Sequence, residues 1–166
     1  MNEQQTILLV DDSKENLVLM REAFSMAKCN HLLQEVHNGE EAIKYLKGEG
    51  AYSDRDLFPL PVVMLLDLKM PKLDGFGVLS WVRAQAGLKR LTIICLTASA
   101  LDTDLERVAD LGANAFLVKP ISLYTLASMM RFVCDWIAIC GFPTLRAEET
   151  NEKRAVRERL ASQFSR

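Results

Sequence analysis

Five short apolar runs, separated by segments with helical periodicity, constrain the fold of this chain more than any other feature. The runs cover residues 7–10, 33–36, 62–66, 91–96 and 115–118. The first, third and fourth are almost wholly apolar, which is typical of strands buried on both faces of a parallel sheet. The alternation of strand and helix predicts an α/β fold: a doubly wound sheet of five parallel strands with helices on both faces.

The intervening segments carry helix signals at their ends. Leu17, Met20 and Phe24 share one helical face, and Ser13 before them is suited to cap a helix. Gly112 is suited to end the helix that precedes the fifth run. We therefore expect each pair of strands to be joined by a helix.

Two segments fall outside this alternation. The loop over residues 47–61 is long and contains two glycines and two prolines, so we expect an ordered surface loop without chemistry. The sequence Gly141-Phe142-Pro143 breaks the last helix, and a strongly charged segment follows it. We expect a folded domain over residues 5–140 and a C-terminal extension over residues 141–166 that is helical or disordered.

The composition excludes several classes of protein. The 166 residues include 20 basic and 22 acidic side chains, a net charge of -2, which argues against a general binder of nucleic acid or membrane surfaces. The N-terminal residues MNEQQT are polar, unlike a signal peptide. No apolar stretch reaches about 18 residues. We expect a cytoplasmic protein that neither spans a membrane nor binds DNA directly.

Cysteine chemistry is not expected from the spacing. No C-x-x-C pair is present, and neither His31 nor His37 lies at a metal-ligand spacing from a cysteine. We therefore expect buried or half-buried thiols in a reducing compartment. The four cysteines are Cys29, Cys95, Cys134 and Cys140.

Polar residues follow four of the runs and are expected to meet, because ligands of open parallel sheets bind at the carboxyl ends of the strands. They are Asp11, Asp12, Asp67, Thr97 and Lys119. Carboxylates about 4 Å apart repel by about 4 kcal/mol per pair at an effective dielectric of about 20, and one lysine cannot offset three of them. Either a proton is taken up or a cation binds, and Mg²⁺ suits carboxylates beside a phosphate. Asp67 is then a candidate nucleophile that carries a phosphoryl group.

The stretches ILLVDD, LLDLKMPKLDG, LTA and GANAFLVKPI resemble the signature of the two-component response-regulator receiver domain. The resemblance implies a flavodoxin-like sheet with strand order 2-1-3-4-5. It also implies a stand-alone response regulator, which takes a phosphoryl group from a sensor histidine kinase or phosphotransfer protein. Such a protein is a switch that catalyses its own phosphotransfer and dephosphorylation rather than an enzyme. The long loop and extended C-terminus resemble regulators paired with bacterial phytochrome kinases.

The resemblance assigns the acceptor and the metal ligands. Asp67 corresponds to the phosphoacceptor. Asp12, Asp67 and the backbone carbonyl of Lys69 correspond to direct Mg²⁺ ligands, and Asp11 to a ligand that acts largely through water. Lys69 and Ser99 occupy the positions that tune phosphoryl lifetime in this family, and the sequence leaves the direction of their effect open.

It also assigns the phosphoryl contacts and the switch. Thr97, the Ala98 N–H and Lys119 correspond to groups that hold the phosphoryl oxygens. Phe116 occupies the aromatic switch position and is expected to move with Thr97. The two-state element would comprise the fourth helix, fifth strand and fifth helix. The Lys119–Pro120 bond corresponds to a cis peptide of the family.

The last helix has two apolar stripes, a wider apolar surface than one sheet face needs. The first is Leu126, Met130, Val133 and Ile137, and the second is Met129, Phe132, Trp136 and Ile139. Two interpretations stay open for the second stripe: a homodimer surface, or a surface covered by the C-terminal extension.

Three other functions are less consistent with the residues. A phosphorylation-independent receiver-like scaffold is the main alternative, although every acceptor-site position is filled. A phosphatase of the haloacid dehalogenase type would need a second acid where Lys69 stands. A dinucleotide enzyme would need a third glycine where Ser80 ends GFGVLS.

Overall fold

The structure is a computed structural model that describes residues 4–98 and 102–140. Within these residues, five strands form a parallel sheet in the order β2-β1-β3-β4-β5. The predicted doubly wound α/β fold and its strand order are therefore confirmed. The strands are β1 (Thr6–Val10), β2 (Leu32–Val36), β3 (Val63–Asp67), β4 (Thr92–Thr97) and β5 (Ala115–Val118).

Two strands extend further toward their carboxyl ends than the apolar runs. β3 includes Asp67 and β4 includes Thr97, which the sequence placed just beyond the strands. In the parallel register, Asp67 lies opposite Leu96 and Thr97 lies opposite Val118. The sheet therefore fixes the backbone of both residues at its carboxyl edge.

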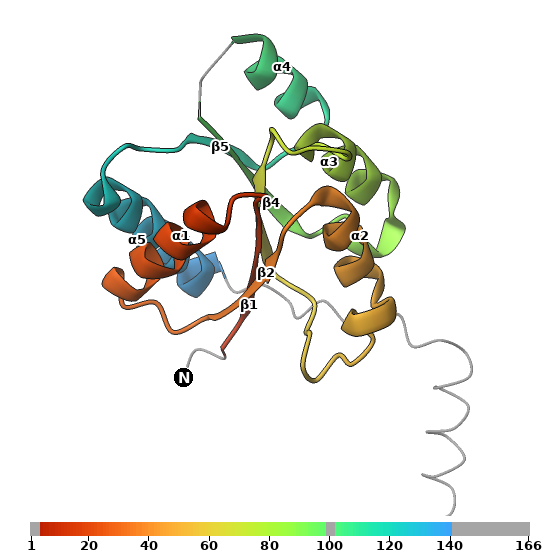
Figure 1. Ribbon diagram of the computed structural model, residues 1–166, viewed down its shortest axis with the longest axis horizontal. Coiled ribbons are helices and arrows are strands. Elements are labelled where there is room, and N and C mark those ends of the chain that lie inside the picture. Colours follow the sequence, from red (N-terminus) through yellow and green to blue (C-terminus); the bar gives the residue numbers. More distant parts are fainter. Residues whose placement is uncertain (1–3, 99–101, 141–166) are drawn as a thin grey trace, which may run out of the picture.

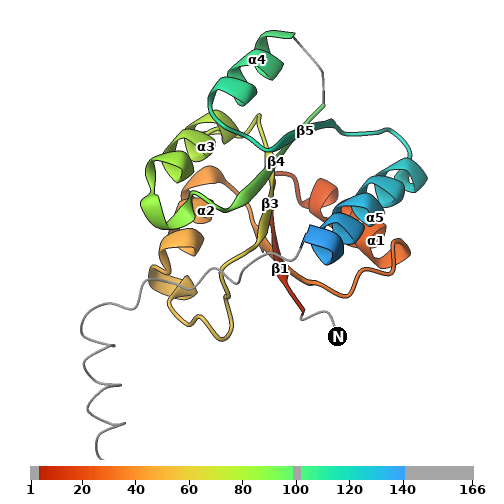
Figure 2. The same ribbon diagram turned by 180° about the vertical axis from the view of Figure 1, so that it is seen from behind.

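Helices cover both faces of the sheet, as Figures 1 and 2 show. The helices α1 and α5 lie together on one face, and α2 and α3 lie on the other, with α4 beyond α3 near β5. The α-helices are α1 (Lys14–Met26), α2 (Gly39–Lys47), α3 (Gly75–Ala84), α4 (Asp102–Asp110) and α5 (Leu123–Cys140). Two short 3-10 helices, η1 (Gly50–Tyr52) and η2 (Ala86–Leu88), lie in the loops after α2 and α3.

The two layers of core follow from the alternation of side chains along each strand. In β1, Ile7 and Leu9 pack with α1 and α5, whereas Leu8 and Val10 pack with α2 and α3. All four side chains are at most 1% exposed. The almost wholly apolar composition of this strand is thus explained by burial on both faces.

Residues with small side chains cap the ends of several helices. Side-chain oxygens of Ser13, Asn38 and Asp74 accept backbone N–H groups at the starts of α1, α2 and α3. Gly112 follows α4 with a φ of 84°, a left-handed conformation that glycine adopts without strain. The helix ends predicted at Ser13 and Gly112 are therefore confirmed. Ser99, which the family resemblance places at a position that tunes phosphoryl lifetime, lies outside the described residues.

The long loop before β3 has a defined conformation, as predicted. The guanidinium of Arg55 donates to the carbonyl oxygens of Tyr45 and Leu46 at 2.8 Å and of Phe58 at 3.1 Å. These bonds join the end of α2 to the segment that leads into β3. Arg55 therefore organises the loop through backbone groups that would otherwise lack partners at a helix end.

The helix α5 corrects the expectation that no apolar stretch reaches about 18 residues. It has 18 residues with a mean hydropathy of 1.4, long and apolar enough by length and composition to cross a membrane. A single helix of this kind is a weak indication, because core helices pass the same test. Leu126, Met130, Val133 and Ile137 of α5 are buried in the core shared with α1. Packing therefore accounts for the first apolar stripe.

Two of the four cysteines are joined, which corrects the expectation of four thiols. Cys29, after α1, and Cys134, in α5, form a disulfide with their Cα atoms 6.2 Å apart. The two residues are 105 positions apart in the chain, so no local spacing could have revealed the contact. Cys95 is a buried free thiol and Cys140 is an exposed one.

Candidate functional site

Three carboxylates lie together at the carboxyl edge of the sheet. Asp11 and Asp12 follow β1, and Asp67 ends the neighbouring strand β3. One oxygen of each lies within 4.8 Å of the others. Asp11 and Asp67 are only 1% and 7% exposed, whereas Asp12 is exposed. The cluster is therefore accessible to solvent from the side of Asp12.

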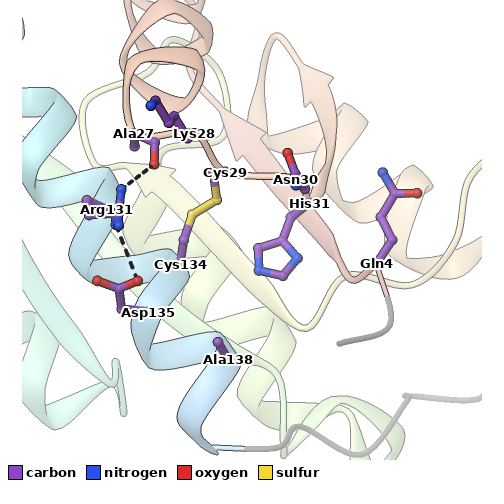
Figure 3. Close-up of a pocket in the computed structure, with 10 residues that line it drawn as sticks. All are labelled: Gln4, Ala27, Lys28, Cys29, Asn30, His31, Arg131, Cys134, Asp135 and Ala138. Carbon is purple, nitrogen blue, oxygen red and sulfur yellow. Dashed lines mark hydrogen bonds and ion pairs between the residues drawn. A yellow bond between two sulfur atoms is a disulfide. The ribbon is translucent and has the colours of Figure 1, made fainter. Parts of the chain in front are cut away.

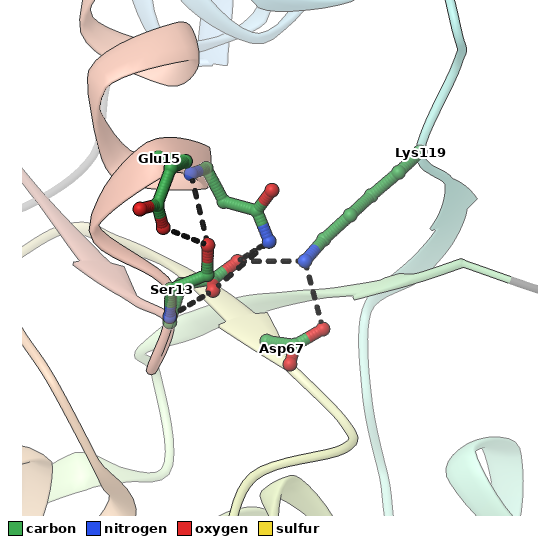
Figure 4. A network of polar contacts seen from close by, with 6 residues as sticks. Ser13, Glu15, Asp67 and Lys119 are labelled. Carbon is green, nitrogen blue, oxygen red and sulfur yellow. Dashed lines mark hydrogen bonds and ion pairs between the residues drawn. The ribbon is translucent and has the colours of Figure 1, made fainter.

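Lys119 joins two of these carboxylates. Its Nζ lies 2.6 Å from Oδ2 of Asp11. The same Nζ lies 2.9 Å from Oδ1 of Asp67, as Figure 4 shows. The backbone N–H of Lys119 donates to the carbonyl oxygen of Thr97 at 2.7 Å. This bond continues the pairing of β4 with β5 by one residue and holds the lysine beside the end of β4.

Asp11 is further oriented by the first turn of α1. Its Oδ1 accepts the backbone N–H of Ser13 at 2.9 Å, and both of its oxygens accept from Nδ2 of Asn16 at 3.2 Å. Asn16 was not among the site residues predicted from the sequence. The available signal was its position in the first turn of a helix that starts directly after the Asp11-Asp12 pair.

Gly75 allows α3 to begin directly behind Asp67. A Cβ at this position would lie 2.7 Å from the Cα of Leu68 and closer still to the carbonyl oxygen of Asp67. Both are backbone atoms and cannot rotate away. The N–H of Gly75 also donates to the carbonyl oxygen of Leu68 at 3.0 Å. The lack of a side chain at Gly75 is therefore a requirement of the site.

The electrostatics of the cluster favour a partner with positive charge. Burial raises the pKa of Asp67, and the charges of Asp11 and Asp12 act in the same direction, while Lys119 opposes them. Burial alone would lower the pKa of Lys119, but its bonds to Asp11 and Asp67 and their charges outweigh burial and raise it. One ammonium thus faces three carboxylates, and oxygen donors of this kind fit a hard divalent cation.

A comparison with known families accounts for most of the chain. Residues 7–131 match the family described as "Response regulator receiver domain". The chain belongs to the response regulator receiver family. This membership disfavours the phosphatase and dinucleotide-enzyme alternatives.

Several receiver proteins are similar to this chain along nearly their whole length. Response regulator Rcp1 of Synechocystis sp. is 33% identical over 143 residues, which cover 86% of this chain and 95% of that protein. The chain also matches the crystal structure of the phosphorylated cyanobacterial phytochrome response regulator RcpA, with 30% sequence identity and a TM-score of 0.75. This match covers 87% of this chain and 99% of the RcpA chain. The Mn²⁺-bound form of Rcp1 is 31% identical with a TM-score of 0.70, covering 86% and 99%. The resemblance to phytochrome-associated regulators is thus confirmed.

The other predicted site residues of this receiver domain lie on the same edge or beside it. Thr97 is buried at the end of β4, and Ala98 follows it in an exposed position. Phe116 is half-buried in β5 and packs against the core on the α3 side. Lys69 has an exposed side chain two residues after Asp67. The roles assigned to these residues stay predictions.

The peptide bond between Lys119 and Pro120 is trans, because the described residues contain no cis peptide. The expectation of a cis bond at this position of the receiver domain is therefore wrong for this structure. An X-Pro bond favours trans by only about 0.5–1 kcal/mol, so the two residue types alone do not fix the isomer.

Proposed function

We propose that this receiver domain is a stand-alone response regulator whose Asp67 accepts a phosphoryl group from a sensor histidine kinase or a phosphotransfer protein. The observation that carries the proposal is the cluster of Asp11, Asp12 and Asp67 bridged by Lys119. Burying two carboxylates beside a third is unfavourable for folding alone, because their charges repel. Such a cost is common at sites that carry out chemistry.

Mg²⁺ is the proposed cofactor. Asp12, Asp67 and the backbone carbonyl of Lys69 would hold it directly, and Asp11 would act largely through water. When bound, the cation supplies positive charge beside the carboxylates and the incoming phosphoryl group. The all-oxygen donor set supports a hard cation, and the structure of Rcp1 with Mn²⁺ supports a divalent one.

In the proposed transfer, a carboxylate oxygen of Asp67 attacks the phosphorus of a phosphohistidine. The new P–O bond forms while the P–N bond breaks, and the imidazole leaves with the electron pair of that bond. The ammonium of Lys119, the Thr97 hydroxyl and the Ala98 N–H would donate to the phosphoryl oxygens. Lys119 is already 2.9 Å from Asp67, within reach of a group attached to it. Attack by water on the acyl phosphate later restores the carboxylate.

The proposed conformational switch begins when phosphorylation of Asp67 changes the contacts of Lys119. A phosphoryl group on Asp67 offers more negative charge and more acceptor oxygens than the free carboxylate. Lys119 and Thr97 would both turn their side chains toward it, and the backbone hydrogen bond of 2.7 Å between them keeps the two residues side by side. The conformation of the surface formed by α4, β5 and α5, which includes Phe116 of β5, would change as a result.

We further propose that this change alters a homodimer contact of α5. In the second apolar stripe, Met129 and Trp136 pack partly against the core, whereas Phe132 and Ile139 are 71% and 83% exposed. Exposed apolar side chains of this size are typical of contact surfaces. We place this activity in the cytoplasm, without direct DNA binding.

Intact-mass spectrometry with light scattering after size exclusion tests the proposal. With Mg²⁺ and acetyl phosphate we expect an adduct of about 80 Da, lost in Asp67→Asn and retained in Asp56→Asn, a matched change at an exposed aspartate in the loop before β3. A change of oligomer with the adduct supports the α5 homodimer, whereas an unchanged monomer supports a surface covered by the C-terminal extension. Absence of both adduct and Mg²⁺ binding would support the phosphorylation-independent scaffold instead.

A further inference from the structure

A second cluster of metal-binding side chains lies at the amino edge of the sheet, away from the carboxylates. Cys29 and His31 precede β2, and Cys134 lies on α5. One ligand atom of each residue lies within 4.8 Å of the others. The neighbouring backbone is ordered by a bond of 2.8 Å from the N–H of Leu32 to the carbonyl oxygen of Gln5, at the start of β1. The three side chains are thus gathered by elements far apart in the sequence.

The cluster borders a cavity of about 440 Å³. Figure 3 shows His31 beside the Cys29–Cys134 disulfide, with Arg131 and Asp135 of α5 on the other side of it. Nδ1 of His31 accepts the N–H of Gln5 at 3.4 Å, a longer distance than the usual value of about 2.9–3.0 Å. The cavity leaves room for a small ligand beside the sulfur atoms.

We propose that Cys29, Cys134 and His31 form a site for one thiophilic divalent cation of the zinc class, which is filled when the disulfide is reduced and emptied when it forms. The same two sulfur atoms are bonded either to each other or to the metal. The two states are therefore mutually exclusive, and the site senses redox conditions. The proposal stands independently of the phosphorylation of Asp67.

A dithiol reductant supplies the electrons and protons for the change from disulfide to metal site. The S–S bond of Cys29 and Cys134 breaks, and each sulfur takes one electron and one proton from the dithiol, which becomes a disulfide itself. Zn²⁺ then displaces the two thiol protons to solvent and binds the thiolates. In the reverse direction a disulfide oxidant takes up the two electrons, with two protons from solvent, and becomes a dithiol; the Cys29–Cys134 bond re-forms and Zn²⁺ is released. Water from the cavity would take the fourth position.

The geometry suits zinc better than the cation proposed for the carboxylates. Two thiolates and one imidazole, with one position open, are an established donor set for Zn²⁺. With Zn–S bonds of about 2.3 Å and a tetrahedral angle, the sulfur atoms would lie about 3.8 Å apart. Sulfur atoms bonded in a disulfide lie only about 2.05 Å apart, so Cys29 and Cys134 can reach that separation only after their bond is reduced. Hard cations such as Mg²⁺ prefer oxygen donors, so the two sites select different metals.

Titration of the reduced full-length chain with Co²⁺, in excess Mg²⁺, tests the proposal. Mg²⁺ occupies oxygen sites, and Co²⁺ bound by thiolates gives a near-ultraviolet charge-transfer band that carboxylate ligands do not give. We expect this band to saturate at one equivalent, to disappear on adding Zn²⁺, and to be absent from the oxidised protein. Absence of the band from the reduced protein would overturn the proposal.

Three variants at the proposed ligands and one control variant assign the ligands. Cys29→Ser and Cys134→Ser should abolish the band, while Cys140→Ser, a change at an exposed free cysteine, should keep it. His31→Gln should weaken affinity by at least about 10-fold, because even groups behind the ligands change metal affinity by about 10- to 100-fold. A band that persists in Cys29→Ser or Cys134→Ser would show that the metal binds elsewhere.

Alkylation of the wild-type protein gives a test that needs no variant. In the reduced chain, Zn²⁺ should protect Cys29 and Cys134 from iodoacetamide and leave Cys140 reactive, as read by peptide mass spectrometry. Equal labelling of all three cysteines with and without Zn²⁺ would contradict the proposal even if the variants failed to fold.

Discussion

The Nζ of Lys119 lies 2.6 Å from Oδ2 of Asp11, a residue 108 positions earlier in the chain. Asp11 follows β1 and Lys119 follows β5, and strands β3 and β4 lie between those two strands in the sheet. The ammonium therefore spans the edge of the sheet and supplies part of the positive charge that the carboxylates require. It competes with any cation that binds the same oxygens.

Replacement of Lys119 separates its competition with Mg²⁺ from its proposed role in holding the phosphoryl group. We expect Lys119→Met to tighten Mg²⁺ binding by about 10-fold, because unit charges about 3 Å apart interact by about 1.4 kcal/mol even at the dielectric of water. The same change should abolish phosphorylation by acetyl phosphate. Isothermal titration with Mg²⁺ and intact mass measure the two effects, with Lys89→Met as the control at an exposed lysine. Weaker Mg²⁺ binding in Lys119→Met would contradict the competition.

The stability of the metal-free protein should depend on Asp67. Burial raises the pKa of this carboxyl above its ordinary value of 3.8, so the folded chain binds more protons than the unfolded chain between the two pKa values. Stability therefore falls as pH rises through that window, and the loss persists at neutral pH. We expect Asp67→Asn to be more stable at pH 7 by about 1 kcal/mol, a rise in Tm of roughly 2–4 °C.

Thermal unfolding in EDTA from pH 4 to pH 7 checks this expectation. Asp56→Asn, with its exposed carboxylate, should follow the wild type. The difference between wild type and Asp67→Asn should shrink as pH falls, and a difference of constant size would argue against a raised pKa.

The close contact of Gly75 with the backbone of Asp67 and Leu68 predicts that alanine substitutions at Gly75 and Gly77 change stability differently. Gly75→Ala would place a Cβ against backbone atoms of Asp67 and Leu68, so we expect a loss of about 1–3 kcal/mol and weaker Mg²⁺ binding. Gly77→Ala would meet the end of the Leu73 side chain, which can move, and Oδ1 of Asp74 at an ordinary contact distance of 3.5 Å. This change should be neutral or stabilising by about 0.4–1 kcal/mol. Urea unfolding of both variants measures the contrast, and equal losses would rule out the backbone contact as the cause.

The two free cysteines should differ in reactivity. Cys95 is fully buried in β4, and burial raises the pKa of its thiol to about 12, so its thiolate fraction at pH 8 is about 10⁻⁴. We expect a thiol reagent to label Cys140 rapidly in the native protein and Cys95 only after unfolding in urea. In the Cys140→Ser variant, rapid labelling of Cys95 under native conditions would contradict this expectation and show that β4 opens readily.

The main features of the fold and of the site were predictable because they depend on local pattern. Apolar runs identify the strands, and the polar residues that end them, such as Asp67 and Lys119, must share one edge of a parallel sheet. The order of the strands came from the family resemblance, since the pattern of runs alone fits several orders. The structure then added what fixes each side chain in place.

The features that the sequence did not reveal depend on contacts between distant segments. The orientation of Asp11 by Asn16 requires the direction in which α1 leaves the sheet. The joining of Cys29 to Cys134 requires the packing of α1 on α5. The trans peptide before Pro120 reflects a small energy difference that residue type does not decide.

The bond between Cys29 and Cys134 also defines a covalent ring. Closing a loop of about 100 residues removes conformational entropy worth about 4.7 kcal/mol from the unfolded chain. The ring contains β2, β3, β4 and β5, yet β1, which lies between β2 and β3 in the sheet, is outside it. The cross-link therefore restrains four strands while leaving untethered the one that connects β2 to the others. Detachment of the N-terminal strand, together with the Asp11 that follows it, is the opening motion that oxidation of the cysteines does not oppose.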